Sequence, residues 1–167
     1  MSLFGKIRDV DVGKSGQYFK PGIYKVRVKS VKVKDSQVGP AEKYFIVETE
    51  VLESNNPDIA VGAEKSQVIK MSNVMALPNV KAFVAAASGV DPNSETINEE
   101  VEAYWKKKLE EQGVIQPTET VSFDQVCDLI VSNLNPLGGL ELKLECATIE
   151  TKGEGKEFTK HFWSPKA

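Results

Sequence analysis

The sequence predicts a mainly β protein with inserted helices, built on a small closed barrel of five strands. Strand-like alternation of apolar and polar residues marks three segments before residue 72 and two segments after residue 139. The first of these strands contains a change of phase, and the helical patterns all lie between the third and fourth strands. Another kind of small barrel and an open α+β sheet share this order of elements, so they stay as alternatives.

The first strand is expected over Ile23–Lys34 and carries the clearest pattern in the chain. Apolar residues occupy the even positions from Tyr24 to Val28 and then the odd positions at Val31 and Val33. One extra residue near positions 29 and 30 keeps all of them on the inner face, and a β-bulge supplies such a residue. A long strand bent in this way can contribute to two faces of a barrel.

The remaining elements follow from periodicity and turn residues. Strands are expected over residues 43–52, 64–71, 140–146 and 157–163. A helix is expected over 78–87, and residues 91–139 are expected to add two helices with apolar stripes at Ile97, Val101, Trp105 and Leu109, and at Phe123, Val126, Cys127, Ile130 and Leu134. We therefore expect one domain over 1–167, an N-terminal arm over 1–22 and a helical insertion over 91–139. This order matches a five-stranded Greek-key barrel of the OB type, with the insertion between strands 3 and 4.

Composition excludes several classes of protein. The 167 residues are 41% hydrophobic, contain no apolar run of the length that spans a membrane, and begin without a secretory h-region, so a cytoplasmic location is expected. Two cysteines, Cys127 and Cys146, are expected to be reduced thiols, and together with the single His161 they are too few for a closed zinc site. We expect no cofactor, no metal and no enzymatic activity, since a catalytic triad would depend on His161 and no phosphate-loop motif is present.

Charge is distributed unevenly along the chain. The net charge is −3, yet residues 1–36 hold nine Lys and Arg against three Asp and Glu, whereas residues 91–131 hold three against ten. A basic strand in an acidic protein can still present a local patch to a polyanion. The acidic helices are expected to be a solvated surface, with a partner or self-association face as the alternative.

Three sets of residues are candidates for binding a nucleic acid. The first is the charged side of the first strand, which would neutralise phosphates or is simply solvated: Lys25, Arg27, Lys29, Lys32 and Lys34. The second is a set of aromatic residues that would stack on bases or instead pack in the core: Phe19, Tyr44 and Trp163. The third is the glycine-rich turn between the last two strands, where Lys152 and Lys156 would clamp a ligand or merely flank a flexible hairpin.

Several segments resemble small OB-fold single-stranded-DNA-binding proteins encoded by bacteriophages and prophages. The resemblance covers residues 19–90 and 140–164 and rests on four segments, FKPGIYKV at 19–26, FIVETEVLE at 45–53, NVKAF at 79–83 and the closing strand at 158–163. It implies a protein that binds single-stranded DNA without sequence specificity during replication or recombination, in the host cytoplasm. Its expected partners are single-stranded nucleic acid, replication or recombination proteins and further copies of the chain. The alternative is a structural or adaptor protein that uses the barrel and its helical insertion for protein contacts.

Overall fold

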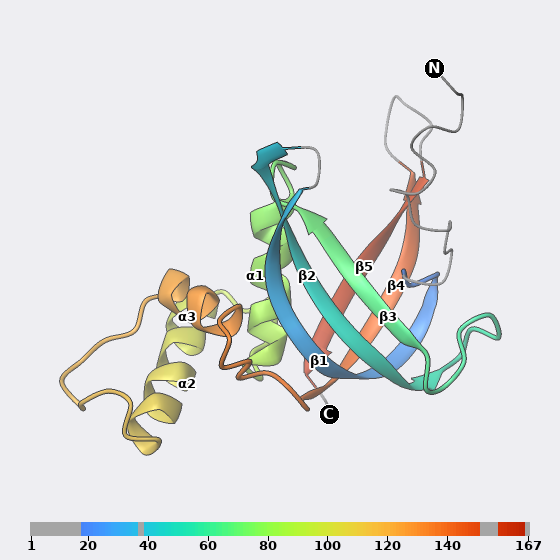
Figure 1. Ribbon diagram of the computed structural model, residues 1–167. Coiled ribbons are helices and arrows are strands. Elements are labelled where there is room, and N and C mark those ends of the chain that lie inside the picture. Colours follow the sequence, from blue (N-terminus) through green and yellow to red (C-terminus); the bar gives the residue numbers. More distant parts are fainter. Residues whose placement is uncertain (1–17, 37–38, 151–156, 166–167) are drawn as a thin grey trace.

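The fold is mainly β, with three strands followed by three helices and two further strands (Figure 1). The computed structural model describes residues 18–36, 39–150 and 157–165. Its elements are β1 (Gly22–Ser36), β2 (Gly39–Ser54), β3 (Glu64–Lys70), α1 (Ala76–Ala87), α2 (Ile97–Glu111), α3 (Phe123–Ile130), β4 (Glu141–Glu150) and β5 (Glu157–Pro165). This is the order that the sequence predicts, with β1 and β2 longer at both ends. No helix in these ranges is long and apolar enough to cross a membrane.

The five strands form one antiparallel sheet in the order β3-β2-β1-β4-β5 (Figure 1). The expected closure into a barrel is not observed, because no backbone pairing joins the edge strands β3 and β5 within the described ranges. Side chains and a short segment occupy the seam instead. Tyr18 forms a parallel bridge with Ser66 at the edge of β3, and the indole N–H of Trp163 donates to the side-chain oxygen of Gln67 over 2.7 Å. The sheet is therefore curved but open along this seam.

The predicted bulge in β1 is confirmed. Val28 pairs with Thr49 of β2 and Ser30 pairs with Glu48, so Lys29 is the extra residue. Because of this shift Val31 is buried together with Val28. The inward position expected for Val33 is wrong: it is 41% exposed, because it lies near the end of β1 and borders a groove beside the helices.

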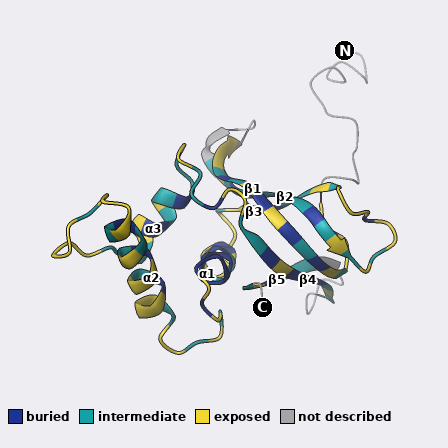
Figure 2. Ribbon diagram, turned by 90° about the horizontal axis from the view of Figure 1, so that it is seen from below, coloured by how far each residue is buried: buried dark blue, intermediate teal, exposed yellow. Residues whose placement is uncertain are grey.

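Helix α1 is the centre of the hydrophobic core. Its Phe83 packs against Phe45 of β2 and Trp163 of β5, with ring centroids 6.1 Å and 5.0 Å apart. The helix is buried nearly all round its C-terminal half, as expected for a helix with packed elements on two sides. Figure 2 shows α1 between the sheet and the pair α2 and α3.

The helical insertion shares this core. Trp105 of α2 is almost fully buried, and its indole N–H donates to the hydroxyl of Ser88, next to the end of α1, over 2.8 Å. Val126 and Ile130 of α3 are buried in the same hydrophobic cluster as the sheet residues. The expected continuation of the α3 stripe to Leu134 is wrong, because α3 ends at Ile130 and Leu134 is 78% exposed.

Candidate nucleic-acid interface

The predicted basic face of β1 projects outward from the sheet, but most of its cations are paired with carboxylates of β2, β3 and β4. The pairs are Lys25–Glu141 at 3.5 Å, Arg27–Glu50 at 3.7 Å, Lys29–Glu64, and Lys32–Glu48 at 2.6 Å. The hydrogen bond from Lys32 is the main cause that lowers the pKa of the Glu48 carboxyl. Lys34 has no ion pair among the described residues. The five cations therefore do not form an uninterrupted basic track.

These ion pairs lie at the protein surface, which limits their strength. Each partner keeps between 27% and 71% of its side chain exposed. Exposed pairs of this kind typically contribute about 0–1 kcal/mol to stability. A phosphate group can therefore replace the carboxylate at small cost, although the displaced carboxylates would remain nearby and repel a polyanion.

The aromatic residues expected to stack on bases are not all accessible. Phe19 and Trp163 are only 3% and 4% exposed, so the structure corrects the expectation for both: they are core residues. Phe19 packs against Tyr24 and His161, with centroids 5.2 Å and 5.9 Å apart. Tyr44 is half-buried on the outer side of β2 and stays a candidate.

An exposed ring that the sequence did not single out lies on β5. Phe162 is 44% exposed, and the ammonium group of Lys160 lies 5.1 Å from its ring centroid. Alternation along β5 predicts that only one pair of its aromatic positions is exposed, but it does not say which pair, since both sides carry rings. A cation beside an exposed ring is the combination used by single-strand binders. Lys152 and Lys156 lie outside the described residues.

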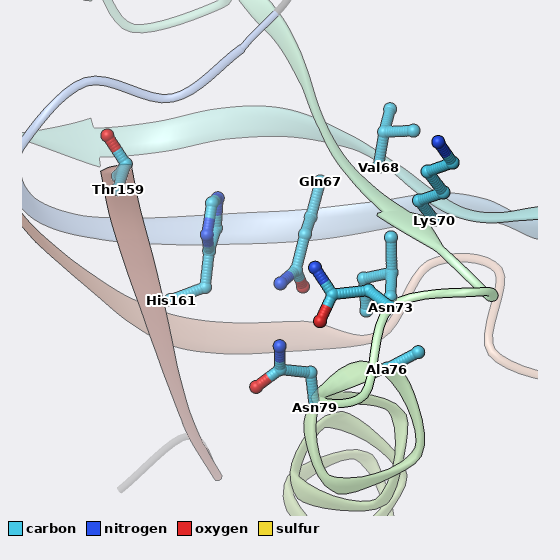
Figure 3. A pocket seen from close by; sticks show the side chains of 9 residues that line it. Gln67, Val68, Lys70, Asn73, Ala76, Asn79, Thr159 and His161 are labelled. Atoms are coloured by element: carbon cyan, nitrogen blue, oxygen red, sulfur yellow. The ribbon is translucent and has the colours of Figure 1, made fainter. Parts of the chain in front are cut away.

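A polar pocket opens in the seam between β3 and β5, and we call it the edge pocket. Its volume is about 150 Å³, and it is lined by Gln67, Val68, Ile69, Lys70, Asn73, Ala76, Asn79, Thr159 and His161. Figure 3 shows side chains from β3, β5, α1 and the turn before α1 around one space, with the amides of Gln67, Asn73 and Asn79 close to one another. Among the described lining residues there is no carboxylate, so the pocket favours neutral or anionic groups.

Two amides of the edge pocket have fixed orientations. The Gln67 oxygen accepts the Trp163 indole N–H, and the Asn73 oxygen accepts the backbone N–H of Met75 over 2.8 Å. Because both oxygens are engaged, both NH₂ groups remain as donors, and neither has a hydrogen-bond partner in the described part of the chain. The pocket therefore offers two NH₂ groups that can donate hydrogen bonds to a ligand.

His161 supplies the complementary acceptor. Its Nε2 is buried and has no hydrogen-bond partner among the described residues. Burial lowers the pKa of His161 to about 4, only partly opposed by a hydrogen bond to the backbone of Thr159. The imidazole is therefore neutral near pH 7, and because the Thr159 carbonyl requires an N–H, Nδ1 carries the proton and Nε2 is a free acceptor.

A second, larger hollow lies between the sheet and the insertion, and we call it the helix groove. It has a volume of about 700 Å³ and is lined by Val33, Phe45, Met71, Leu77, Val80, Lys81, Asn98, Glu99, Glu102, Ser122, Phe123, Asp124, Cys127, Asp128 and Val131. Its floor is apolar and four carboxylates stand among its lining residues. These features fit a protein segment with apolar and basic side chains better than they fit DNA.

The two cysteines have no reactive character. Burial is the main cause that raises the pKa of Cys127 to about 11 and that of Cys146 to about 12. Both thiols are therefore protonated at neutral pH and act as small apolar side chains. In the described ranges, no group of three or more His, Cys, Asp or Glu side chains is arranged to hold a metal ion.

Comparison with known proteins does not assign the chain to a family. No protein-family model matches it, and no curated protein sequence is significantly similar to it.

Proposed function

We propose that this protein binds single-stranded DNA without sequence specificity, on an OB-type framework, in phage-type replication or recombination in the host cytoplasm. The strand order β3-β2-β1-β4-β5 with α1 between β3 and β4 agrees with an OB topology whose seam has no backbone pairing between the described residues of β3 and β5. The resemblance of residues 19–90 and 140–164 to phage single-stranded-DNA-binding proteins supports both the OB-type framework and the DNA-binding function.

The edge pocket is the observation that carries this proposal. Among its described residues it combines two unused amide donors and one unused buried acceptor with no carboxylate, which are properties of a site for a polar ring rather than for a peptide carrying basic groups. Phe162 and Lys160 lie on the same strand, β5, and offer a stacking platform with a positive charge. The cations of β1 would supply phosphate contacts after their surface ion pairs open.

Titration of a labelled oligo-dT at low and at moderate salt tests the proposal. We expect saturable binding that weakens as salt increases, with a slope of about −0.7 in log affinity against log salt for each phosphate neutralised. Changing Lys25, Arg27 and Lys29 together to Glu should weaken binding and flatten that slope. The control makes the same charge change at Lys106–Lys108 on α2 and should bind nearly as wild type. A wild-type protein that binds no oligo-dT at low salt would contradict the proposal.

A protein-contact role is the second candidate function, and the helix groove favours it. Leu77 on its border is 71% exposed, and Met71 and Val33 add apolar surface beside it. Under this alternative the groove binds a replication or recombination protein, or another copy of the chain. Sedimentation of the wild type and of Leu77→Asp over a range of concentrations tests self-association. Loss of a dimer in the variant with unchanged oligo-dT binding would show that the two surfaces act separately.

A further inference from the structure

The size of the edge pocket restricts which base can enter it. Its volume is about 150 Å³. A cavity of about 150 Å³ in another protein holds one benzene ring, so the edge pocket has room for one six-membered ring. The two fused rings of a purine need more space than this, so a purine would extend from the open side of the pocket. Ile69 and Ala76 provide apolar wall between the polar groups, as expected of a pocket that takes a flat ring.

The hydrogen-bonding groups of the pocket restrict the base further. Gln67 and Asn73 each present an NH₂ donor, and His161 presents one acceptor at Nε2. A ligand that satisfies all three needs two acceptors and one N–H donor. Thymine (O2, O4 and N3–H) and cytosine (O2, N3 and N4–H) both have this combination on the Watson–Crick edge.

The purines do not offer this combination. Adenine has one acceptor and one amino group on its Watson–Crick edge, and guanine has one acceptor and two donors. Either purine would leave one of the fixed donors of the pocket without a partner. The donor of Gln67 belongs to a buried side chain and is costly to leave unpaired, whereas the exposed Asn73 amide can bond to water, so hydrogen bonding disfavours a purine that leaves Gln67 without a partner. Size and hydrogen bonding therefore select the same class of base by independent routes.

We propose that the edge pocket is a subsite for one pyrimidine base of a bound single strand, with Nε2 of His161 accepting an N–H of that base. This inference rests on the proposed function and adds a base preference to it. Gln67 and Asn73 donate to the two acceptors of the base, and the amide of Asn79 can serve as donor or acceptor beside them. The preference concerns one position of the strand, so the protein still coats DNA of any sequence.

Affinities for oligo-dT, oligo-dC and oligo-dA of equal length test the inference. We expect the wild type to prefer both pyrimidine strands to oligo-dA by about tenfold, equivalent to about 1.4 kcal/mol. His161→Phe keeps a flat ring and removes the acceptor, and it should bring the dT to dA ratio close to one. The free energy needed to unstack oligo-dA before it binds is the same for every protein variant, so it cancels when this ratio is compared between variants.

Asn73→Asp gives a second, milder variant. Asn73 is exposed, and an aspartate retains the oxygen that accepts the Met75 N–H while it removes the donor. The matched control is Asn93→Asp, which adds the same charge at an exposed site outside the pocket. We expect Asn73→Asp to lower the dT to dA ratio and Asn93→Asp to leave it unchanged. A wild-type ratio of one, or a ratio that neither pocket variant alters, would overturn the inference while leaving DNA binding intact.

Titration with nucleosides instead of oligonucleotides tests the pyrimidine subsite separately from DNA binding. His161 is the only histidine in the chain, so its imidazole ¹⁵N signals are assigned without ambiguity. Thymidine and deoxycytidine should shift the Nε2 signal, and deoxyadenosine should not. If no oligonucleotide binds but the pyrimidine nucleosides produce the shift, the proposed function fails and the subsite stands. If no nucleoside produces the shift, the subsite is refuted.

Discussion

Acidification should destabilise the fold through His161, and the size of this effect follows from the burial of the ring. The pKa of His161 is about 4 in the folded protein, against 6.5 for an unperturbed histidine. The unfolded chain therefore takes up a proton as the pH falls from 6.5 towards 4, whereas the folded chain does not. The free energy of unfolding therefore decreases through this window. Below the folded pKa both states bind the proton, so His161 causes no further decrease.

The expected magnitude is large enough to measure. The full pKa difference corresponds to about 3 kcal/mol, and roughly 2 kcal/mol of this is lost between about pH 7.5 and about pH 5. Urea unfolding followed by tryptophan fluorescence gives the free energy at each pH. His161→Phe removes the titrating group, so the difference between wild type and variant isolates it from the carboxylates. Among the described lining residues, Lys70 is the one other ionisable side chain.

Two results would refute this reasoning. An equal decrease in stability for wild type and His161→Phe would show that the imidazole is not protected from protons in the folded state. A wild type that becomes more stable on acidification would show that the protonated ring gains a partner. A direct ¹⁵N titration of the His161 imidazole provides an independent value, which should lie near 4.

Further predictions concern the core and the exposed ring of β5. Ser88→Ala leaves the buried Trp105 indole N–H without its acceptor and should lower the free energy of unfolding in urea by about 1–3 kcal/mol. The control Ser72→Ala, at an exposed position, should lower it by almost nothing. Equal losses would contradict a core shared by the sheet and the helical insertion. Phe162→Ala should weaken oligo-dT binding by about 1–3 kcal/mol without altering the salt slope or the stability, and an unchanged affinity would remove this ring from the interface. Trp163→Ala should instead lower stability by about 3–5 kcal/mol, as expected for a large side chain removed from a core, and a variant as stable as wild type would show that the ring is not packed.

Removal of the carboxylates opposite β1 tests their effect on the basic face. Changing Glu48, Glu50 and Glu64 together to Gln releases Arg27, Lys29 and Lys32 from their ion pairs. We expect tighter oligo-dT binding and a steeper salt slope, with a loss of stability of no more than about 1 kcal/mol per pair. Unchanged affinity and slope would show that this face makes no phosphate contacts.

Local patterns predicted the strands and the bulge, because those features depend on neighbouring residues. The phase change between Val28 and Val31 predicted an extra residue near positions 29 and 30, and the register shows that it is Lys29. The position of Val33 could not be predicted in the same way, since its exposure depends on where the helices leave a groove. Closure of the barrel likewise depends on contacts between β3 and β5, which no local pattern contains.

The electrostatics of β1 required the register of the sheet. Along the strand, the cations have no acidic neighbour from Lys25 to Lys34. In the sheet, Arg27 lies opposite Glu50 of β2 and Glu141 of β4. A pattern within one strand does not reveal which charges will face it on the strands that pair with it.

The edge pocket was hidden for a similar reason. Gln67 and His161 are 94 positions apart in the chain and meet only because β3 and β5 are the two edges of one curved sheet. The single sequence signal was a histidine within an aromatic strand, which more often indicates packing than a site. That its Nε2 has no partner among the described residues follows only from the placement of the elements around it.

A chemical-shift map of the ¹⁵N-labelled protein with oligo-dT tests whether the edge pocket and β5 bind single-stranded DNA. We expect the largest shifts on residues 67–79 and 159–162, around the edge pocket and along β5, with smaller shifts along the outer face of β1. Shifts confined to α2, α3 and the border of the helix groove, or an unchanged spectrum at saturating oligo-dT, would contradict this expectation.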